Sequence, residues 1–296
     1  MPTSVVQQSI LYGNKVESIE RSLESIARAA LLGRQFGIDE YTVSYGDSSP
    51  VPSLSTQQLK SFRERFPALN ITYDFFNTNL GSAGGHNRLA ASATADFILI
   101  QNPDVIPSPR LLENLVAPFS NPSVGMVEAK QLPIEHPKEY DPVTGDTSWA
   151  STACAIVRRD TFERLAGFDS ETFFLYCDDV DFSWRVKELG LRVIFQPSAI
   201  VFHDKRLTQS GTWKTTPTEQ YYSAEAALLL SYKWSRQDLT EKILDSFSKS
   251  SEPFYTKAAA EFRRRQGENL LPAKRDSNHL IAQFINGNYA QHRYAL

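Results

Sequence analysis

The sequence predicts an α/β fold with a doubly wound, mainly parallel sheet, followed by a helical C-terminal region. Three observations support this prediction. Strand-like and helix-like segments alternate through the first half of the 296-residue chain. Residues 97–100 form a fully apolar run, as in a strand buried on both faces of its sheet. Beyond about Thr215, strand patterns give way to helical ones.

The first half is composed of four strand–helix units. Strands are predicted at residues 4–12, 41–45, 71–76 and 97–100, and helices at residues 16–30, 59–66, 86–95 and 111–119. Apolar residues recur every three or four positions in the first helix, and Ser55 and Gln58 form a capping box ahead of the second. This alternating order implies parallel strands with helices on both faces of the sheet.

The second half changes character part of the way along. A strand is predicted at residues 153–158, a short helix at 161–166, a helix at 180–189 that Gly190 ends, and one or two strands at 191–202. Four helices are then predicted, at residues 221–234, 239–247, 254–265 and 278–285. We therefore expect a sheet domain over residues 1–214 and a helical region over residues 215–296, which serves docking of a second molecule or oligomerisation.

Composition excludes several classes of protein. The net charge of −3 argues against a nucleic-acid partner, which usually requires a basic excess. Cys154 and Cys177 form no CxxC pair and cannot build a disulfide framework. The N-terminus has no signal-peptide pattern, and no apolar run reaches the roughly 20 residues that span a bilayer. We expect a cytoplasmic protein. Peripheral contact with the inner face of a membrane is compatible with this location.

Ligands of doubly wound sheets bind beyond the carboxyl ends of the strands. Distinctive residues follow the first four predicted strands at these positions, namely Tyr12 and Asn14, Asp47, Asn79 to Asn87, and Asn102 to Asp104. The third group contains Gly81, Gly84 and Gly85 and leads into a helix, so it suits close approach of an anion. A tight turn between strand and helix explains the same glycines equally well.

Two further groups suit a divalent cation. Asp104 directly follows the buried strand, and a carboxylate there is a suitable ligand for a hard cation, although an Asn-Pro turn is the simpler explanation. His203 ends a later strand. A lone histidine is more often structural than a ligand, unless carboxylates from other strand ends lie beside it.

Three carboxylates crowd into four residues at Asp178, Asp179 and Asp181. Such a cluster repels itself, so it commonly serves a metal or base chemistry. Helix capping explains Asp178, and an ion pair with Arg185 one helical turn later explains Asp181. Neither explanation suits Asp179, which leaves it as the candidate general base.

Taken together, these motifs resemble glycosyltransferase family 2, the inverting nucleotide-sugar enzymes of the GT-A fold. The resemblance covers roughly residues 4–206 and is strongest to the rhamnosyltransferase and galactofuranosyltransferase branch. The family's NxGxAGGxN stands at residues 79–87, its NPD at 102–104, its GGFDExFF segment at 166–174 and its EDxDxxxR at 178–185. Four motifs in the same order make a specific match.

The resemblance implies a role for each matched residue. Tyr12 and Asp47 would contact the nucleobase, Asp104 and His203 would bind Mn²⁺ or Mg²⁺, and Asp179 would be the base. The residues implied in donor binding are Tyr12, Asn14, Asp47, Asn79, Gly84, Gly85, Asn87, Asn102, Asp104, Trp149 and Thr152. The sequence departs from the family pattern in two places: Gly13 is inserted in the first turn, and Thr152 replaces a glycine of WxxGA.

The implied reaction moves a sugar, with inversion, from a nucleoside-diphosphate donor to a hydroxyl group. The donor would carry UDP or dTDP, the sugar would be rhamnose, galactofuranose or a similar hexose, and the acceptor would be a glycan or lipid-linked glycan of cell-surface polysaccharide synthesis. Asp178 and Asp181 would raise the pKa of Asp179 by repulsion, while Arg185 would oppose the rise.

Two other functions stay open at this point. A nucleotidyltransferase would need a basic, glycine-rich turn after the first strand, where the sequence has Tyr12-Gly-Asn-Lys15. A degenerate relative would act as a binding or assembly module without catalysis. The basic run at residues 263–265 is typical of a solvated helix face. The alternatives are that the helical region docks the acceptor, forms a dimer contact or rests on an anionic membrane surface.

Overall fold

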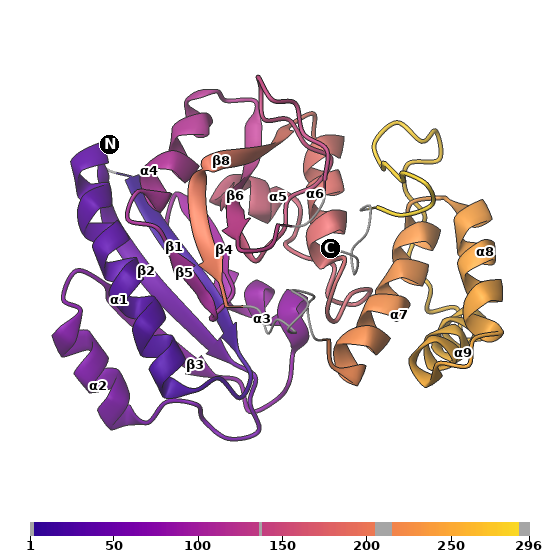
Figure 1. The fold of residues 1–296 in the computed structure, drawn as a ribbon, viewed down its shortest axis with the longest axis horizontal. Helices are drawn as coiled ribbons and strands as arrows, with labels where there is room; N and C mark the ends of the chain where they lie inside the picture. Colours follow the sequence, from indigo (N-terminus) through magenta and orange to yellow (C-terminus); the bar gives the residue numbers. More distant parts are fainter. Residues whose placement is uncertain (1–2, 136–137, 205–214, 290–296) are drawn as a thin grey trace.

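The computed structural model describes residues 3–135, 138–204 and 215–289. These residues form an eight-stranded sheet in the order β3-β2-β1-β4-β7-β6-β8-β5, with helices on both faces and three more helices to one side (Figure 1). The strands are β1 (Thr3–Leu11), β2 (Ile38–Asp47), β3 (Asn70–Phe75), β4 (Phe97–Gln101), β5 (Val105–Pro107), β6 (Val124–Leu132), β7 (Cys154–Arg158) and β8 (Arg192–His203).

The four strands of the first half are confirmed as a parallel unit. β1 lies between β2 and β4 and is parallel to both, and β3 is parallel to β2. All five residues of β4 are buried, as its apolar pattern predicts. From β4 onward the sheet is mixed, because β7 runs antiparallel to both β4 and β6, and β5 runs antiparallel to β8.

The sequence analysis missed β5 and β6. β5 is only three residues long, too short to show a period. β6 includes Glu128, Lys130 and Gln131, whose polar side chains interrupt its apolar pattern, yet Glu128 and Gln131 are fully buried in the folded chain. Their burial shows that long-range pairing with β7 and β8, rather than local propensity, forms this strand.

The helices of the first two hundred residues match their predicted positions with shifted ends. They are α1 (Val16–Gly33), α2 (Thr56–Arg65), α3 (Gly81–Ala90), α4 (Leu111–Val116), α5 (Arg159–Arg164) and α6 (Asp178–Glu188). The capping box of α2 is confirmed, because Ser55 and Gln58 each accept from the other's backbone N–H. α3 begins five residues before the predicted start and includes most of the glycine-rich turn.

Two hydrophobic layers sandwich the sheet. One contains Ile19 and Leu23 of α1, Phe62 of α2 and Leu112 of α4. The other contains Ala83 of α3, together with side chains from α5 and α6. Burial of apolar surface in both layers is the main stabilising term of such a fold.

The helical region consists of α7 (Pro217–Lys233), α8 (Gln237–Ser248) and α9 (Pro253–Gly267), drawn orange to yellow in Figure 1. Three of its four predicted helices are confirmed. The fourth, at residues 278–285, is wrong: the chain there forms turns and a bridge between Ile285 and Asn288. The Asp276 carboxylate accepts the N–H groups of residues 280, 281 and 282, and so competes with helical hydrogen bonding.

The helical region shares a hydrophobic core with the segment around α6. Trp184 of α6 meets the ring of Trp234, which follows α7, edge to face at 5.2 Å, and Phe284 touches Trp184 from the C-terminal turns. The same cluster includes Phe173 and Val180. The expected boundary after residue 214 lies at the edge of residues 205–214, outside the described residues, so the division into two domains stays a prediction. None of the helices in the described ranges is both long and apolar enough to cross a membrane.

Candidate active site

The first part of the site is the corner where β4 ends. The backbone N–H of Asn102 donates to the carbonyl of Ala153, which fixes the loop that carries Asp104. β5 then pairs with the end of β8, so that Val105 lies opposite His203. As a result His203 Nε2 lies 3.4 Å from Asp104 Oδ1. The fold therefore brings together the two residues that the sequence analysis expects to bind a metal.

The donor set at this corner fits a divalent cation that a substrate helps to bind. One carboxylate and one imidazole converge, and the Asp104 side chain is 41% exposed. The neighbouring Asp204 carboxylate is instead held by Arg21 at 2.6 Å. Within the described ranges no group of three or more His, Cys, Asp or Glu side chains gathers. Two protein ligands leave coordination positions for phosphate oxygens and water, as Mg²⁺ and Mn²⁺ sites of nucleotide enzymes require.

The second part is the start of α6, where the backbone is strained. Tyr176 and Cys177 have φ angles of 68° and 56°, a left-handed conformation that is uncommon for residues other than glycine. Consecutive residues of this kind persist only where the surrounding structure holds them, commonly at functional sites. They set the direction in which Asp178 and Asp179 enter the helix.

Asp178 and Asp179 lie in different environments. Asp178 is buried, and desolvation together with the charge of Asp179 raises its pKa to about 7, although a hydrogen bond with the Ser82 side chain opposes the rise. Asp179 is half-buried, and its Oδ1 accepts the N–H of Val180 at 2.9 Å. The expectation that Asp178 caps the helix is wrong, because Cys177 occupies the N-cap position and Asp178 is the first helical residue.

Asp181 points away from this pair, into the contact with α7. Its Oδ2 accepts from Arg185 Nε at 2.8 Å, which confirms the predicted ion pair. Its Oδ1 lies 2.6 Å from Lys233 Nζ and accepts from Trp234 Nε1 at 3.1 Å. Lys233 also binds Asp169 at 2.6 Å. Because these cations compensate the fully buried carboxylate, Asp181 holds the helical region against α6.

Arg185 completes the same arrangement. Its Nη1 donates to the carbonyl oxygens of Leu165 and Gly167, at 2.9 and 2.8 Å. The side chain is buried, so these carbonyls and Asp181 take the place of water. From the sequence we expect Asp181 and Arg185 to change the pKa of Asp179. Their side chains instead bind structural groups: Asp181 bonds Lys233 and Trp234, and Arg185 bonds the carbonyls of Leu165 and Gly167.

The glycine-rich turn packs directly against the segment that precedes the candidate general base Asp179. A Cβ atom on Gly81 would lie 2.2 Å from the carbonyl oxygen of Phe174, and the N–H of Ser82 donates to this oxygen at 3.0 Å. A Cβ atom on Gly85 would press on Ile10 of β1 at 2.9 Å, whereas Gly84 has ordinary room. Gly81 and Gly85 are thus explained by close packing of α3.

The two asparagines at the ends of this motif have different uses. Asn79 is exposed, and its Oδ1 accepts the N–H of Gly81 at 3.1 Å. Asn87 bonds the backbone of Phe168 twice, once as donor and once as acceptor, at 2.8 Å each. A Cβ atom on Gly167 would collide with the Asn87 amide. Asn87 therefore connects α3 to the turn at Gly167 and Phe168, upstream of Asp179. A direct contact between Asn87 and the donor stays a prediction.

The predicted nucleobase end lies at the carboxyl ends of β1 and β2. Asp47 is fully buried and accepts from the backbone N–H groups of Ser49 and Ser53 and from the Tyr73 hydroxyl. Burial alone would raise the pKa of Asp47, but these hydrogen bonds hold it below its usual range. Asp47 thus shapes the loop at residues 48–53. Tyr12 beside it is 61% exposed.

The inserted glycine of the first turn fits this arrangement. Gly13 has a φ of 66°, and its N–H donates to the Ser49 hydroxyl at 2.9 Å. The Asn14 side chain accepts the N–H of Tyr12 at 2.9 Å. These contacts present the Tyr12 ring to solvent at the edge where a base is expected to stack.

Trp149 and Thr152, the predicted donor-sugar contacts, are buried. Trp149 is 3% exposed; the Lys138 ammonium lies 4.0 Å from the ring centroid, and Tyr289 meets the ring edge to face at 5.8 Å. Lys138 also pairs with Glu128. Burial raises the pKa of Glu128 to about 8 despite the attraction of Lys138. A sugar contact by Trp149 would thus require Lys138 or Tyr289 to move.

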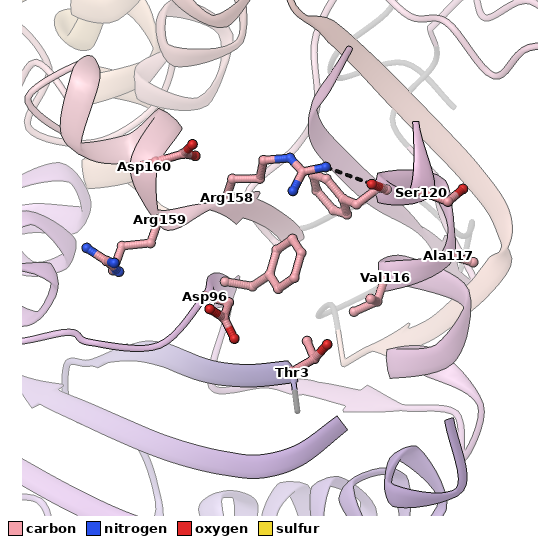
Figure 2. A pocket seen from close by; sticks show the side chains of 10 residues that line it. Thr3, Asp96, Val116, Ala117, Ser120, Arg158, Arg159 and Asp160 are labelled. Carbon is pink, nitrogen blue, oxygen red and sulfur yellow. Dashed lines mark hydrogen bonds between the residues drawn. The ribbon is translucent and has the colours of Figure 1, made fainter. Parts of the chain in front are cut away.

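A pocket of about 670 Å³ lies at the opposite edge of the sheet, by the starts of β1 and β4 (Figure 2). Arg158 lies within it and donates to the carbonyls of Phe119 and Val124, at 2.7 and 3.3 Å. The Asp96 carboxylate accepts from Ser4. Because these charged groups already bind the protein, and because the pocket is at the amino ends of the parallel strands, it is separate from the candidate site.

Two of the three arginines in the basic run of α9 pair with carboxylates of the helical region. Arg264 pairs with Glu261 and Glu268, and Arg265 pairs with Glu261 and Glu225. Arg263 donates to the Ser248 hydroxyl at 2.7 Å, and a membrane contact by this run stays a prediction.

Sequence reasoning missed Lys233, Lys138 and Gln131. Each meets a site residue from a distant part of the chain: Lys233 bonds Asp181, Lys138 covers Trp149, and Gln131 Oε1 lies 2.8 Å from His203 Nδ1. No local motif surrounds them in the sequence, so only the tertiary contacts identify them.

The strand order, with helices on both faces of the sheet, is that of the GT-A fold, and solved glycosyltransferase structures share this architecture. A mannosyltransferase from Pyrobaculum calidifontis, solved with GDP-Man and Mn²⁺, aligns with a TM-score of 0.58 and 17% identity over 94% of this chain and 78% of its own. GalNAc-T7, solved with UDP, GalNAc and Mn²⁺, aligns with a TM-score of 0.64 and 13% identity, over 95% of this chain and 57% of its own. At these identities the likeness shows the fold.

Residues 10–181 match the profile of glycosyl transferase family 2, and the chain belongs to this family. Pre-mycofactocin glycosyltransferase of Mycobacterium tuberculosis H37Rv is 30% identical over 168 residues, which cover 50% of this chain and 35% of the relative. N-acetylglucosaminyl-diphospho-decaprenol L-rhamnosyltransferase of the same strain is 32% identical over 111 residues, or 36% of each chain. The chain thus aligns with about a third of the length of these curated relatives, and the second one supports the rhamnosyltransferase-like branch.

Proposed function

We propose that this chain is an inverting, metal-dependent glycosyltransferase. Its donor is a UDP- or dTDP-linked rhamnose, galactofuranose or similar hexose, and its acceptor is a hydroxyl of a glycan or lipid-linked glycan in cell-surface polysaccharide synthesis at the cytoplasmic face of the membrane. The observation that carries the proposal is the convergence of Asp104 and His203, 3.4 Å apart, at the edge where such sheets bind nucleotides.

In the proposed reaction Asp179 takes the proton of the acceptor hydroxyl as its oxygen attacks the anomeric carbon of the donor. The bond from that carbon to the diphosphate breaks on the opposite face, so the configuration of the sugar inverts and the nucleoside diphosphate leaves. A positioned general base contributes about 10²- to 10⁴-fold. Asp179 is suited to the role because it is half-buried and lies beside the buried Asp178.

Asp178 adjusts how the pair shares charge. Because burial and Asp179 raise the pKa of Asp178 to about 7, a fraction of the molecules holds Asp178 protonated at neutral pH. In those molecules Asp178 carries no charge and does not repel the carboxylate of Asp179.

Asp104 and His203 would hold the divalent cation. When bound, the cation supplies positive charge that stabilises the departing diphosphate. Asp104 would contribute a carboxylate oxygen and His203 its Nε2, while the loop at Asn102 is held by its backbone bond to Ala153. Tyr12 would stack on the base, and Asn79 and Gly84 would border the diphosphate and sugar.

The test is a panel of nucleotide sugars incubated with the protein and Mn²⁺, with nucleoside diphosphate release and sugar transfer measured separately. We expect release from one UDP or dTDP sugar, its loss with EDTA, and a product of inverted anomeric configuration by NMR. Turnover of nucleoside triphosphate and sugar phosphate with pyrophosphate release would instead support a nucleotidyltransferase. A nucleotide-induced rise in melting temperature without turnover of any donor would support a degenerate binding module.

A further inference from the structure

His203 has a buried partner on the side of its ring that faces away from Asp104. Nδ1 of the imidazole lies 2.8 Å from Oε1 of Gln131, on the neighbouring strand β6. The Gln131 side chain is fully buried, and His203 is only 7% exposed. Gln131 is paired with Val201 in the register of β6 and β8, which fixes it beside the end of β8.

The chemistry of this contact decides which ring nitrogen carries the proton. An amide oxygen only accepts hydrogen bonds, so it favours the tautomer in which Nδ1 bears the hydrogen. The other nitrogen, Nε2, then carries the free lone pair, and Nε2 is the atom that faces Asp104 at 3.4 Å. The opposite tautomer would place two lone pairs against each other at Nδ1 and would block Nε2 with a hydrogen.

We propose that Gln131 is a positioning residue for cation binding, because it holds His203 in the Nδ1–H tautomer with Nε2 directed to the space beside Asp104. The inference rests on the proposed metal-dependent function, and it identifies a residue that would orient one of the two metal ligands. Histidine ligands of metals commonly donate their second ring nitrogen to such a partner, and loss of the partner typically weakens metal affinity 10- to 100-fold.

Burial explains why a glutamine suits this position. Water has little access to Nδ1 when the ring and its partner are both buried, so the protein itself supplies the acceptor. Gln131 Nε2 has no hydrogen-bond partner among the described residues, although it is buried. Such an uncompensated group costs stability, and a role for the oxygen of the same amide gives a reason to keep it.

The chain offers a matched control in Gln101. This second glutamine is also buried, at 1% exposure, ends β4 close to the same corner, and donates from Nε2 to the Val105 carbonyl at 3.3 Å. Gln131→Leu and Gln101→Leu therefore remove similar buried amides, and only the first removes the acceptor of His203. Gln131→Glu keeps an acceptor oxygen at that position.

The first measurement is the tautomer of His203, read from the ¹⁵N shifts of the histidine-labelled protein at pH 8.5 and assigned with His203→Asn. It needs neither metal nor substrate. We expect Nδ1–H in the wild type, in Gln101→Leu and in Gln131→Glu, and a tautomer mixture in Gln131→Leu. An Nε2–H wild type, or the same tautomer in Gln131→Leu as in the wild type, overturns the inference.

The second measurement is the affinity for Mn²⁺ alone, from the EPR signal of the free ion. We expect Gln131→Leu to bind Mn²⁺ 10- to 100-fold more weakly than the wild type, with partial rescue in Gln131→Glu, and Gln101→Leu to bind like the wild type. In the His203→Asn background, Gln131→Leu should add nothing further. Equal affinities of Gln131→Leu and Gln101→Leu overturn the inference.

The two measurements separate the inference from the proposed function. A wild type that binds Mn²⁺ neither alone nor with UDP or dTDP, but shows a Gln131-dependent Nδ1–H tautomer, would overturn the metal dependence and support the tautomer assignment. A wild type that binds Mn²⁺ and transfers sugar, with a tautomer that ignores Gln131, would support the function and overturn the inference.

Discussion

Two carboxylate centres of this protein differ in how their charge is compensated. Asp181 is buried and met by Arg185, Lys233 and the Trp234 indole, all within 3.1 Å. The corner of Asp104 and His203 is partly exposed: the two groups lie 3.4 Å apart, and the Asp104 side chain is 41% exposed. The first centre is enclosed by protein groups, whereas the second can be reached from solvent.

The difference shows how to separate structural from functional carboxylates. A buried charge that the protein compensates is costly to disturb, and its burial keeps a substrate from reaching it. A carboxylate that is partly exposed beside a second donor can be reached by a ligand. Asp179 is half-buried and belongs with the accessible carboxylates, whereas Asp181 is fully buried and compensated, although one motif carries both.

The largest effect is expected at Asp179. Asp179→Asn should lower sugar transfer by at least about 100-fold, because it removes the proposed base, while the melting temperature stays within a few degrees of the wild type. Transfer rates with the donor identified by the panel would measure it. Asp160→Asn, at the start of α5 by the opposite pocket, is the matched control. Transfer by Asp179→Asn near the wild-type rate would exclude Asp179 as the base.

A substitution at the buried ion pairs of Asp181 should lower the stability of the fold. Lys233→Met should reduce the free energy of unfolding by about 3 kcal/mol, because it leaves Asp169 without its cation and the buried Asp181 with Arg185 as its remaining cation. Urea denaturation would measure the loss. Lys242→Met on the exposed face of α8 should cost less than about 0.5 kcal/mol. A loss below about 1 kcal/mol at Lys233 would mean that the contact between α6 and α7 does not depend on this ion pair.

Asp178 predicts a pH dependence of stability. Its pKa is about 7 in the folded chain and near 4 in the unfolded chain, so the folded state binds more protons between these values. The free energy of unfolding should therefore fall, by up to about 4 kcal/mol from this group, as pH rises from 4 to 7.

Asp178→Asn should remove this part of the fall, and the difference between variant and wild type isolates it from Glu128, whose pKa of about 8 affects an overlapping range. Urea denaturation from pH 5 to pH 8 would measure both proteins. Parallel curves would show that Asp178 titrates normally.

The smallest effect is expected at Arg21. Arg21→Ala breaks an exposed pair with Asp204, in which the side chains are 54% and 48% exposed, and should cost less than about 1 kcal/mol. It also frees a carboxylate next to His203. We expect the affinity for Mn²⁺ to stay within about twofold, and a clear gain would show that Asp204 is a third ligand that Arg21 restrains.

The sequence by itself determined the local elements and the motifs. Apolar periods predict the parallel strands and most helices, because side-chain spacing along one segment is a local property. The turn motif at residues 79–87 and the carboxylates at the start of α6 can likewise be recognised from residue type and spacing along the chain. Where local reasoning was wrong, a side chain had another partner: Asp276 takes the N–H groups of the expected last helix.

Only the tertiary structure decided which of these residues meet. The pairing of β5 with β8 places His203 beside Asp104, and the packing of α7 on α6 places Lys233 on Asp181. Gln131 comes to His203 through β6, a strand that no local pattern reveals. Such contacts join segments far apart in the chain, and hydrophobic burial and strand register bring them together. The sequence therefore names the groups that carry the chemistry, and the fold selects those that act together.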